Sequence, residues 1–78
     1  MRHMRNQALI DEVAARIKKL REARHITQEV FYNDTRIHLA RIETGQINVT
    51  LSTLDAICKY LGISLQDFFS EIDNKIHP

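Results

Sequence analysis

The 78-residue chain is 44% hydrophobic and 27% charged, which fits one compact globular domain and leaves no room for a second. Its 2 glycines and 1 proline argue against an all-β fold, and its single cysteine excludes an internal disulfide and fits a reducing cytoplasm. The net charge is only +1, although residues 1–46 carry +3 and residues 47–78 carry −2, and no stretch is long enough for a membrane span.

The first predicted helix lies before residue 25. One apolar helix face is built, at steps of three and four residues, by Ile10, Val13, Ile17 and Leu20. Basic residues gather near the C-terminal end, where they suit the helix dipole. We expect the helix to end near His25, because histidine adopts the left-handed conformation more readily than most residues.

Two short helices are predicted next. Thr27 has the position of an N-cap, and its helix should end just before Thr35. Thr35 is itself an N-cap candidate, opening a helix with Leu39 and Ile42 facing inward. Gly45 supplies the left-handed residue at which this helix should end.

Two further helices complete the predicted all-α fold of five helices. Thr50 and Ser64 are their expected N-caps, and Gly62 ends the first of the two. We assign residues 9–72 to one domain, residues 1–8 to a flexible N-terminal segment compatible in part with a cloning remnant, and residues 73–78 to a C-terminal tail. The expected buried stripe of the fourth helix is Leu51, Leu54, Ile57, Cys58 and Leu61.

The segment between Thr27 and Gly45 is the most informative part of the chain. Two helices joined this tightly at a steep angle place the second in a DNA major groove while the first lies across the backbone. The ordered pieces are Leu20-Arg21, Ile26-Thr27-Gln28-Glu29, Arg41-Ile42-Glu43-Thr44-Gly45, Leu51, Leu54 and Leu61-Gly62-Ile63-Ser64-Leu65. Over roughly residues 13–69, the chain resembles the phage repressor/Cro-type (XRE-like) helix-turn-helix family, which implies a compact repressor-like DNA-binding domain.

The chain departs from this family in the length of the motif. The stretch between the Thr-Gln pair and Arg-Ile-Glu is about one helical turn shorter than usual, and residues 31–35 replace the common glycine-containing turn. We therefore expect a shortened first helix of the motif, or a turn of another shape.

The helix predicted from Thr35 supplies the candidate base-reading side chains. With Leu39 and Ile42 inward and about 100° per residue, four residues face away from the core and one lies at the flank. The outward residues are Ile37, Ala40, Arg41 and Thr44, and the flanking residue is Arg36. Arginines suit bidentate contacts to guanine, and small or apolar residues suit thymine methyl groups. The alternatives are ordinary surface charges and a scattered exposed apolar residue.

Phosphate contacts are expected on both sides of this helix. The resemblance assigns one to Gln28, at a helix N-terminus, with a plain polar residue as the alternative. Polar residues in the loop after the helix either donate to phosphates or only form the loop. The complete predicted DNA-binding set is Gln28, Thr35, Arg36, Ile37, Ala40, Arg41, Thr44, Gln46 and Asn48.

Two further expectations concern the contact between two helices of one chain and the contact between two copies of the chain. The resemblance implies a partly buried, structural ion pair between Arg21 and Glu43 that ties the first helix to the recognition helix. Because such motifs read few bases, we expect a homodimer on an inverted repeat. Phe69, Ile72 and Ile76 are the predicted dimer interface, with core packing of the fifth helix as the alternative.

No catalytic chemistry is predicted. Cys58 falls on an apolar helix stripe, which favours a buried, inert thiol over a nucleophile. The histidines (His3, His25, His38 and His77) lack zinc-ligand spacing, and the chain has no glycine-rich phosphate loop. We therefore expect no enzyme activity, no metal, no cofactor, no membrane association and no small-molecule ligand.

The predicted function is a sequence-specific transcriptional regulator that binds double-stranded DNA in the cytoplasm. Two alternatives stay open: a protein-interaction module with the same fold, and an autoregulatory antitoxin or restriction-modification controller protein. Salt separates DNA binding from an apolar protein contact, because phosphate contacts release counterions and weaken as salt rises.

Overall fold

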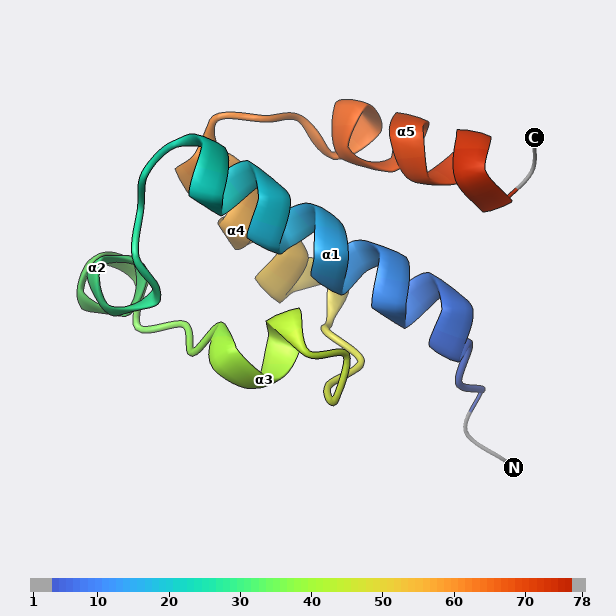
Figure 1. Cartoon of the computed structure of the whole chain (residues 1–78), viewed down its shortest axis with the longest axis horizontal. Helices are drawn as coiled ribbons and strands as arrows, with labels where there is room; N and C mark the ends of the chain where they lie inside the picture. The colour runs from blue at the N-terminus through green and yellow to red at the C-terminus, as the bar shows by residue number, and fades with distance from the viewer. Residues whose placement is uncertain (1–3, 77–78) are drawn as a thin grey trace.

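The computed structural model describes the backbone of residues 4–76 and the side chains of residues 4–72 (Figure 1). Five helices are present in this part: α1 (Gln7–Ala23), α2 (Gln28–Thr35), α3 (Ala40–Glu43), α4 (Leu51–Leu61) and α5 (Leu65–Ile76). No strand is present among residues 4–76, so the predicted all-α, five-helix fold is confirmed. The first helix begins at Gln7 and the last ends at Ile76. None of the described helices is long and apolar enough to span a membrane.

Helix α1 is the centre of the bundle and contacts α3, α4 and α5 (Figure 1). α5 lies along one side of α1, and α2 and α3 lie on the opposite side. The side chains buried most completely come from all five helical regions, because each short helix packs on its neighbours. They are Ile17, Phe31, Leu39, Ile57, Cys58 and Phe68.

Local capping sets most of the helix limits. The side chains of Thr27 and Thr50 accept hydrogen bonds from backbone N–H groups three residues on, and Ser64 accepts one from Asp67 N at 3.0 Å. The C-cap of α4 is Gly62 in the left-handed region, and His25 is left-handed (φ 56°) just after α1. These predicted caps and ends are confirmed.

The prediction of Thr35 as an N-cap is wrong. Thr35 is the last residue of α2, where its hydroxyl donates to Phe31 O at 2.7 Å and accepts from Ile37 N at 3.1 Å. The next residue, Arg36, has a left-handed backbone (φ 64°) that breaks the helical path. Residues 36–39 are irregular, and α3 has only 4 residues. The motif therefore has an 8-residue first helix, an irregular turn at residues 36–39 and a short second helix, which agrees with the expectation of a turn of another shape.

The placement of Leu51 in the buried stripe of α4 is also wrong. The core-facing stripe contains Leu54, Ile57, Cys58 and Leu61, whereas Leu51 is 74% exposed. Leu51 is the first residue of the helix, just after the Thr50 cap, and lies beyond the edge of the core. It leaves an apolar side chain in solvent close to the end of α3.

Candidate nucleic-acid interface

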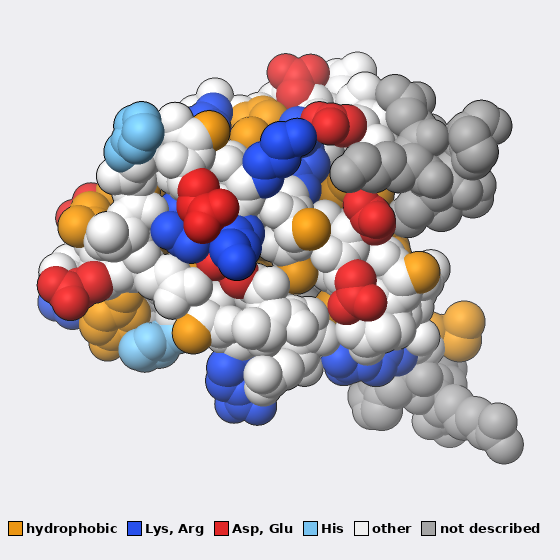
Figure 2. All heavy atoms as spheres, in the orientation of Figure 1, with side chains coloured by type: hydrophobic (Ala, Val, Ile, Leu, Met, Phe, Trp, Pro, Cys, Tyr) orange, Lys and Arg blue, Asp and Glu red, His pale blue; other side chains and the backbone are white. Residues whose placement is uncertain are grey.

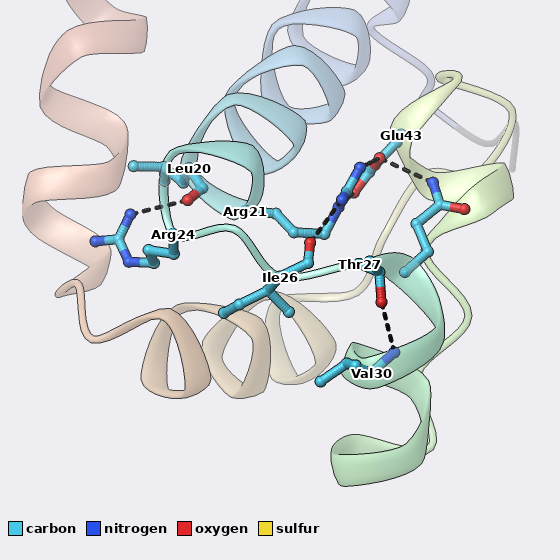
Figure 3. A network of polar contacts seen from close by, with 8 residues as sticks. Leu20, Arg21, Arg24, Ile26, Thr27, Val30 and Glu43 are labelled. Atoms are coloured by element: carbon cyan, nitrogen blue, oxygen red, sulfur yellow. Dashed lines mark hydrogen bonds and ion pairs between the residues drawn. The ribbon is translucent and has the colours of Figure 1, made fainter.

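An ion pair joins α1 to α3 (Figure 3). Arg21 Nε lies 2.7 Å from Glu43 Oε2 and Arg21 Nη2 lies 2.9 Å from Glu43 Oε1, so the contact is bidentate. Arg21 Nη1 also donates to Ile26 O at 2.7 Å. The side chains of the pair are 10% and 3% exposed, and the hydrogen bond to Glu43 raises the pKa of Arg21 above its ordinary value. This buried pair fixes the short α3 helix against the long α1 helix.

Gln28 adds α2 to the same network. Gln28 is the first residue of α2 and is exposed, and its Nε2 donates to Glu43 Oε1 at 3.0 Å. The residue expected to hold a phosphate therefore also braces the ion pair. Through Glu43, the three helices α1, α2 and α3 share one carboxylate.

Arg36 stands at the turn between α2 and α3. It is exposed, and its guanidinium carbon lies 5.4 Å from the centre of the Tyr32 ring. The Tyr32 ring stacks on the His38 ring, with centroids 4.1 Å apart and 26° between the planes. This cluster was not predicted from the sequence. Arg36 follows α2 as its left-handed C-cap, so the four-residue spacing that brings an aromatic ring and an arginine together on one helix does not apply to Tyr32 and Arg36.

The remaining residues of the predicted recognition helix divide into two groups. Ile37 is half-buried and packs against the core, because residues 36–39 do not continue a helix. Ala40 and Arg41 are exposed on α3, and the Thr44 hydroxyl donates to Arg41 O at 3.1 Å. Within residues 4–72, neither Arg36 nor Arg41 forms an ion pair. Two unneutralised arginines therefore flank one short segment.

The loop after α3 is held by the start of α1. Gln7 Nε2 donates to Gly45 O at 3.0 Å, and Arg5 Nη2 donates to Gln46 O at 3.3 Å. The backbone of Gly45 is left-handed (φ 77°). Gln46 and Asn48 themselves are exposed. The loop thus has a fixed backbone and leaves polar side chains free for a partner.

Some of the cationic side chains lie near this segment. Figure 2 shows separate Lys and Arg side chains at the lower edge of the molecule, where Figure 1 places α3 and the start of α1, and others across the middle and top of the same face. Lysine and arginine side chains at this edge would attract a polyanion such as DNA.

An open apolar groove of about 270 Å³ lies beside the loop, between α1, α4 and α5. Its lining includes Ile47, Leu51 and Phe69. Leu51 is 74% and Ile47 36% exposed, and Phe69 is half-buried. The groove is therefore an uncovered apolar surface on the same side of the bundle as the end of α3.

The three residues predicted for a dimer interface lie in different places. Phe69 lines the groove, whereas Ile72 is 3% exposed and belongs to the core of the single chain. An interface role for Ile72 is thus corrected to core packing, because its side chain is already covered within one copy. The side chain of Ile76 lies outside the described residues.

The cysteine and the described histidines have surroundings typical of structural residues. Cys58 is 1% exposed, and burial, with a smaller effect of Asp55, raises the pKa of its thiol. Among the described residues, no group of three or more His, Cys, Asp or Glu side chains is arranged to hold a metal ion. His25 forms the turn after α1 and His38 stacks on Tyr32, while His3 and His77 lie outside the described part.

Comparison with known proteins decides the family. A family model described as Helix-turn-helix matches residues 17–68, which is more than half of the chain. The chain belongs to the helix-turn-helix family. It is also 38% identical over 64 residues to "Control protein C.MunI" of Mycoplasma sp, an alignment that covers 77% of this chain and 86% of that protein. No solved structure matches significantly. The resemblance to the XRE-like helix-turn-helix proteins is confirmed, and the protein is a DNA-binding transcriptional regulator.

Proposed function

We propose that this helix-turn-helix regulator binds an inverted-repeat operator as a homodimer, with residues 36–44 entering the major groove and α2 crossing the backbone. The observation that carries the proposal is the exposure of Arg36 and Arg41, without ion-pair partners in the described part, on a segment fixed by the Arg21–Glu43 pair. Arginines on a fixed backbone suit bidentate contacts to guanine. We assign the protein no catalytic activity and place its action in the cytoplasm, with the DNA it controls.

Individual roles follow from the contacts. Ala40 permits close approach of α3 to base edges because its side chain is small. Ile37 packs on the core, so we assign it support of the turn and at most an edge contact with a thymine methyl group. Thr35 uses its hydroxyl within the protein, which makes it a structural residue of the turn.

The phosphate contacts belong to residues on either side of the groove-reading segment. Gln28 lies at the N-terminus of α2, where free backbone N–H groups favour an anion. Thr44, Gln46 and Asn48 follow α3 on an anchored loop, and the exposed side chains of Gln46 and Asn48 are suited to donate to the next phosphates. The Thr44 hydroxyl would have to turn away from Arg41 O, to which it donates, before it could do the same.

The apolar groove supports the homodimer. Ile47, Leu51 and Phe69 leave apolar area in solvent that a second copy would cover. Ile76, whose side chain is not among those described, stays a candidate from the sequence alone. Because the apolar groove adjoins the loop after α3, two copies that pair through it would hold their DNA-reading segments (residues 36–44) at a fixed separation. A fixed separation is what an inverted repeat requires.

The test is selection of duplexes from a random DNA pool at low and moderate salt. The wild type is compared with the double variant Arg36→Ala/Arg41→Ala, and with Lys18→Ala/Lys19→Ala, which removes the same charge from exposed positions on α1. We expect an inverted repeat to be enriched by the wild type and by the control, and lost with the first variant, while all three remain folded by circular dichroism. A folded wild type that enriches no sequence at any salt would overturn the proposal.

Similarity to a control protein favours a more specific function. We infer that the operator lies upstream of the gene for this chain, so that the protein regulates its own synthesis. Footprinting on that upstream DNA tests the inference, and protection only at other promoters contradicts it.

The 4-residue length of α3 favours one competitor, a protein-interaction module. Apolar contacts of such a module would not weaken as salt rises. Salt-insensitive complexes with a protein partner, together with no duplex selection, would favour that function.

A further inference from the structure

Three side chains form a stacked cluster at the irregular turn between α2 and α3. We call Tyr32, Arg36 and His38 the turn stack. Tyr32 comes from the body of α2 and is half-buried, while Arg36 and His38 are exposed. The Tyr32 ring is 4.1 Å from the His38 ring, centre to centre, and 5.4 Å from the Arg36 guanidinium carbon. One anchored ring therefore touches both exposed side chains.

Arg36 occupies a backbone conformation that disfavours it. Its φ of 64° lies in the left-handed region, where a side chain with a Cβ is strained and glycine is not. Strained residues of this kind persist where the surrounding structure over-determines them, and they cluster at functional sites. The strained backbone at Arg36 therefore indicates a role for its side chain.

The guanidinium of Arg36 is oriented but unused within the protein. No described residue accepts a hydrogen bond from it or pairs with its charge. The aromatic contact restricts its rotamers and leaves its N–H donors available to a ligand. A side chain that is ordered before binding loses less entropy on binding.

We propose that Tyr32 and His38 are positioning residues that hold the Arg36 guanidinium to read one guanine of the operator. This inference rests on the proposed function. A phosphate is attracted from many directions, whereas the O6 and N7 atoms of guanine require an aligned guanidinium plane. The aromatic brace is therefore expected to change base discrimination more than general affinity.

The experiment first assigns base pairs to arginines. Duplex selection with Arg36→Ala and with Arg41→Ala identifies the operator position at which each variant loses its preference. Affinities are then measured for the selected operator and for duplexes with each of those two base pairs replaced. The tested variants are Tyr32→Leu, which removes the ring, Tyr32→Phe, which keeps it, and His38→Ala at an exposed position where folding is not at risk.

For the wild type, replacing the Arg36 base pair should weaken binding roughly tenfold or more. Tyr32→Leu should lose most of this discrimination and keep that at the Arg41 base pair. Tyr32→Phe should resemble the wild type, and His38→Ala should lose part of the discrimination. The salt dependence of binding should stay unchanged in all three, because no phosphate contact is removed.

Two results overturn the inference while leaving the proposed function intact. In one, Tyr32→Leu and His38→Ala retain full discrimination at the Arg36 base pair. In the other, they lose discrimination equally at both base pairs, which is the mark of a general structural role. If Tyr32→Leu does not fold, His38→Ala and Tyr32→Phe decide by the same criteria. Failure of the wild type to select any duplex overturns the proposed function itself, and this inference with it.

Discussion

The ends of α4 and α2 have nearly the same backbone conformation but different residues. Gly62 ends α4 with a φ of 74°, and Arg36 ends α2 with a φ of 64°. At Gly62 nothing lies within 4 Å of where a Cβ would stand, so the glycine serves only the backbone. At Arg36 the chain tolerates strain to keep a long cation at the surface. The comparison distinguishes a scaffold of α1, α4 and α5, in which α4 ends at a glycine, from an α2–α3 edge, in which α2 ends at an exposed arginine. His25 after α1 is also left-handed, so Arg36 is set apart by its place between the two motif helices and not by its backbone alone.

The ion pair that connects the two regions should give the largest effect. Glu43→Ala leaves Arg21 buried without its carboxylate, and breaking a buried pair in this way costs about 3–5 kcal/mol of unfolding free energy. Urea unfolding monitored by circular dichroism measures the loss. The double variant Arg21→Met/Glu43→Leu should recover most of it, and a loss below about 1 kcal/mol in Glu43→Ala would show that the pair is not needed to hold α3.

The two glycines offer the next contrast. Gly62→Ala should cost about 1 kcal/mol, from the left-handed backbone alone. Gly45→Ala should cost about 1 kcal/mol for the same backbone reason and somewhat more in addition, because its Cβ would stand 2.5 Å from Asp11 Oδ1 and the exposed carboxylate would have to move away from its hydrogen bond with Gln7. Thermal unfolding of both variants measures the difference. Adding Asp11→Ala should narrow it, and equal costs in all backgrounds would contradict the crowding at Gly45.

Local chemistry explains which parts of the fold the sequence predicted. Thr27, Thr50 and Ser64 cap helices through hydrogen bonds to residues three positions away, and Gly62 ends a helix by its own backbone freedom. The prediction of Thr35 as an N-cap was wrong because a threonine at the last position of a helix can also use its hydroxyl, in a bond to a backbone carbonyl of the preceding turn. The prediction of Leu51 as buried was wrong because helical periodicity does not indicate where along the helix the core ends.

The candidate site was predicted less fully. Arg21 and Glu43 are 22 residues apart, so no spacing rule joins them, and only the family resemblance indicated the pair now seen in the structure. Ile37 was placed outward by helical counting through residues that are not helical. Tyr32 and His38 were missed because their stacking depends on the left-handed turn between them, which is a property of the folded chain.

Exposed apolar side chains provide a test of the apolar groove as an assembly surface. Leu51→Lys should weaken self-association at least tenfold, about 1.4 kcal/mol, with little effect on unfolding of the monomer, since Leu51 is 74% exposed. Sedimentation over a concentration series measures this. Val30→Lys is the matched control, because Val30 is 45% exposed on α2 and does not line the groove. Equal weakening by both substitutions, or by neither, would contradict a dimer through the groove.

The smallest expected effect concerns the contact between α4 and α2. The hydrogen bond from the Tyr60 hydroxyl to Asp34 raises the pKa of Tyr60, so the folded state holds this proton more tightly than the unfolded state. The contribution is therefore present below the unfolded pKa of about 10 and is lost as pH rises through the folded value. Melting temperatures between pH 8 and 11 should fall more steeply for the wild type than for Tyr60→Phe. Parallel curves would show that this bond adds no pH dependence.

The most direct test of the account is Arg36→Gly, measured for stability and for binding to the selected operator. Removing the strained side chain should raise the unfolding free energy by about 0.5–1 kcal/mol, a few degrees in Tm, because glycine adopts this backbone freely. The same substitution should weaken operator binding at least tenfold. Higher stability with weaker binding is the predicted result. Unchanged or tighter binding by the stabilised variant would contradict the claim that this arginine is kept at the turn to recognise DNA.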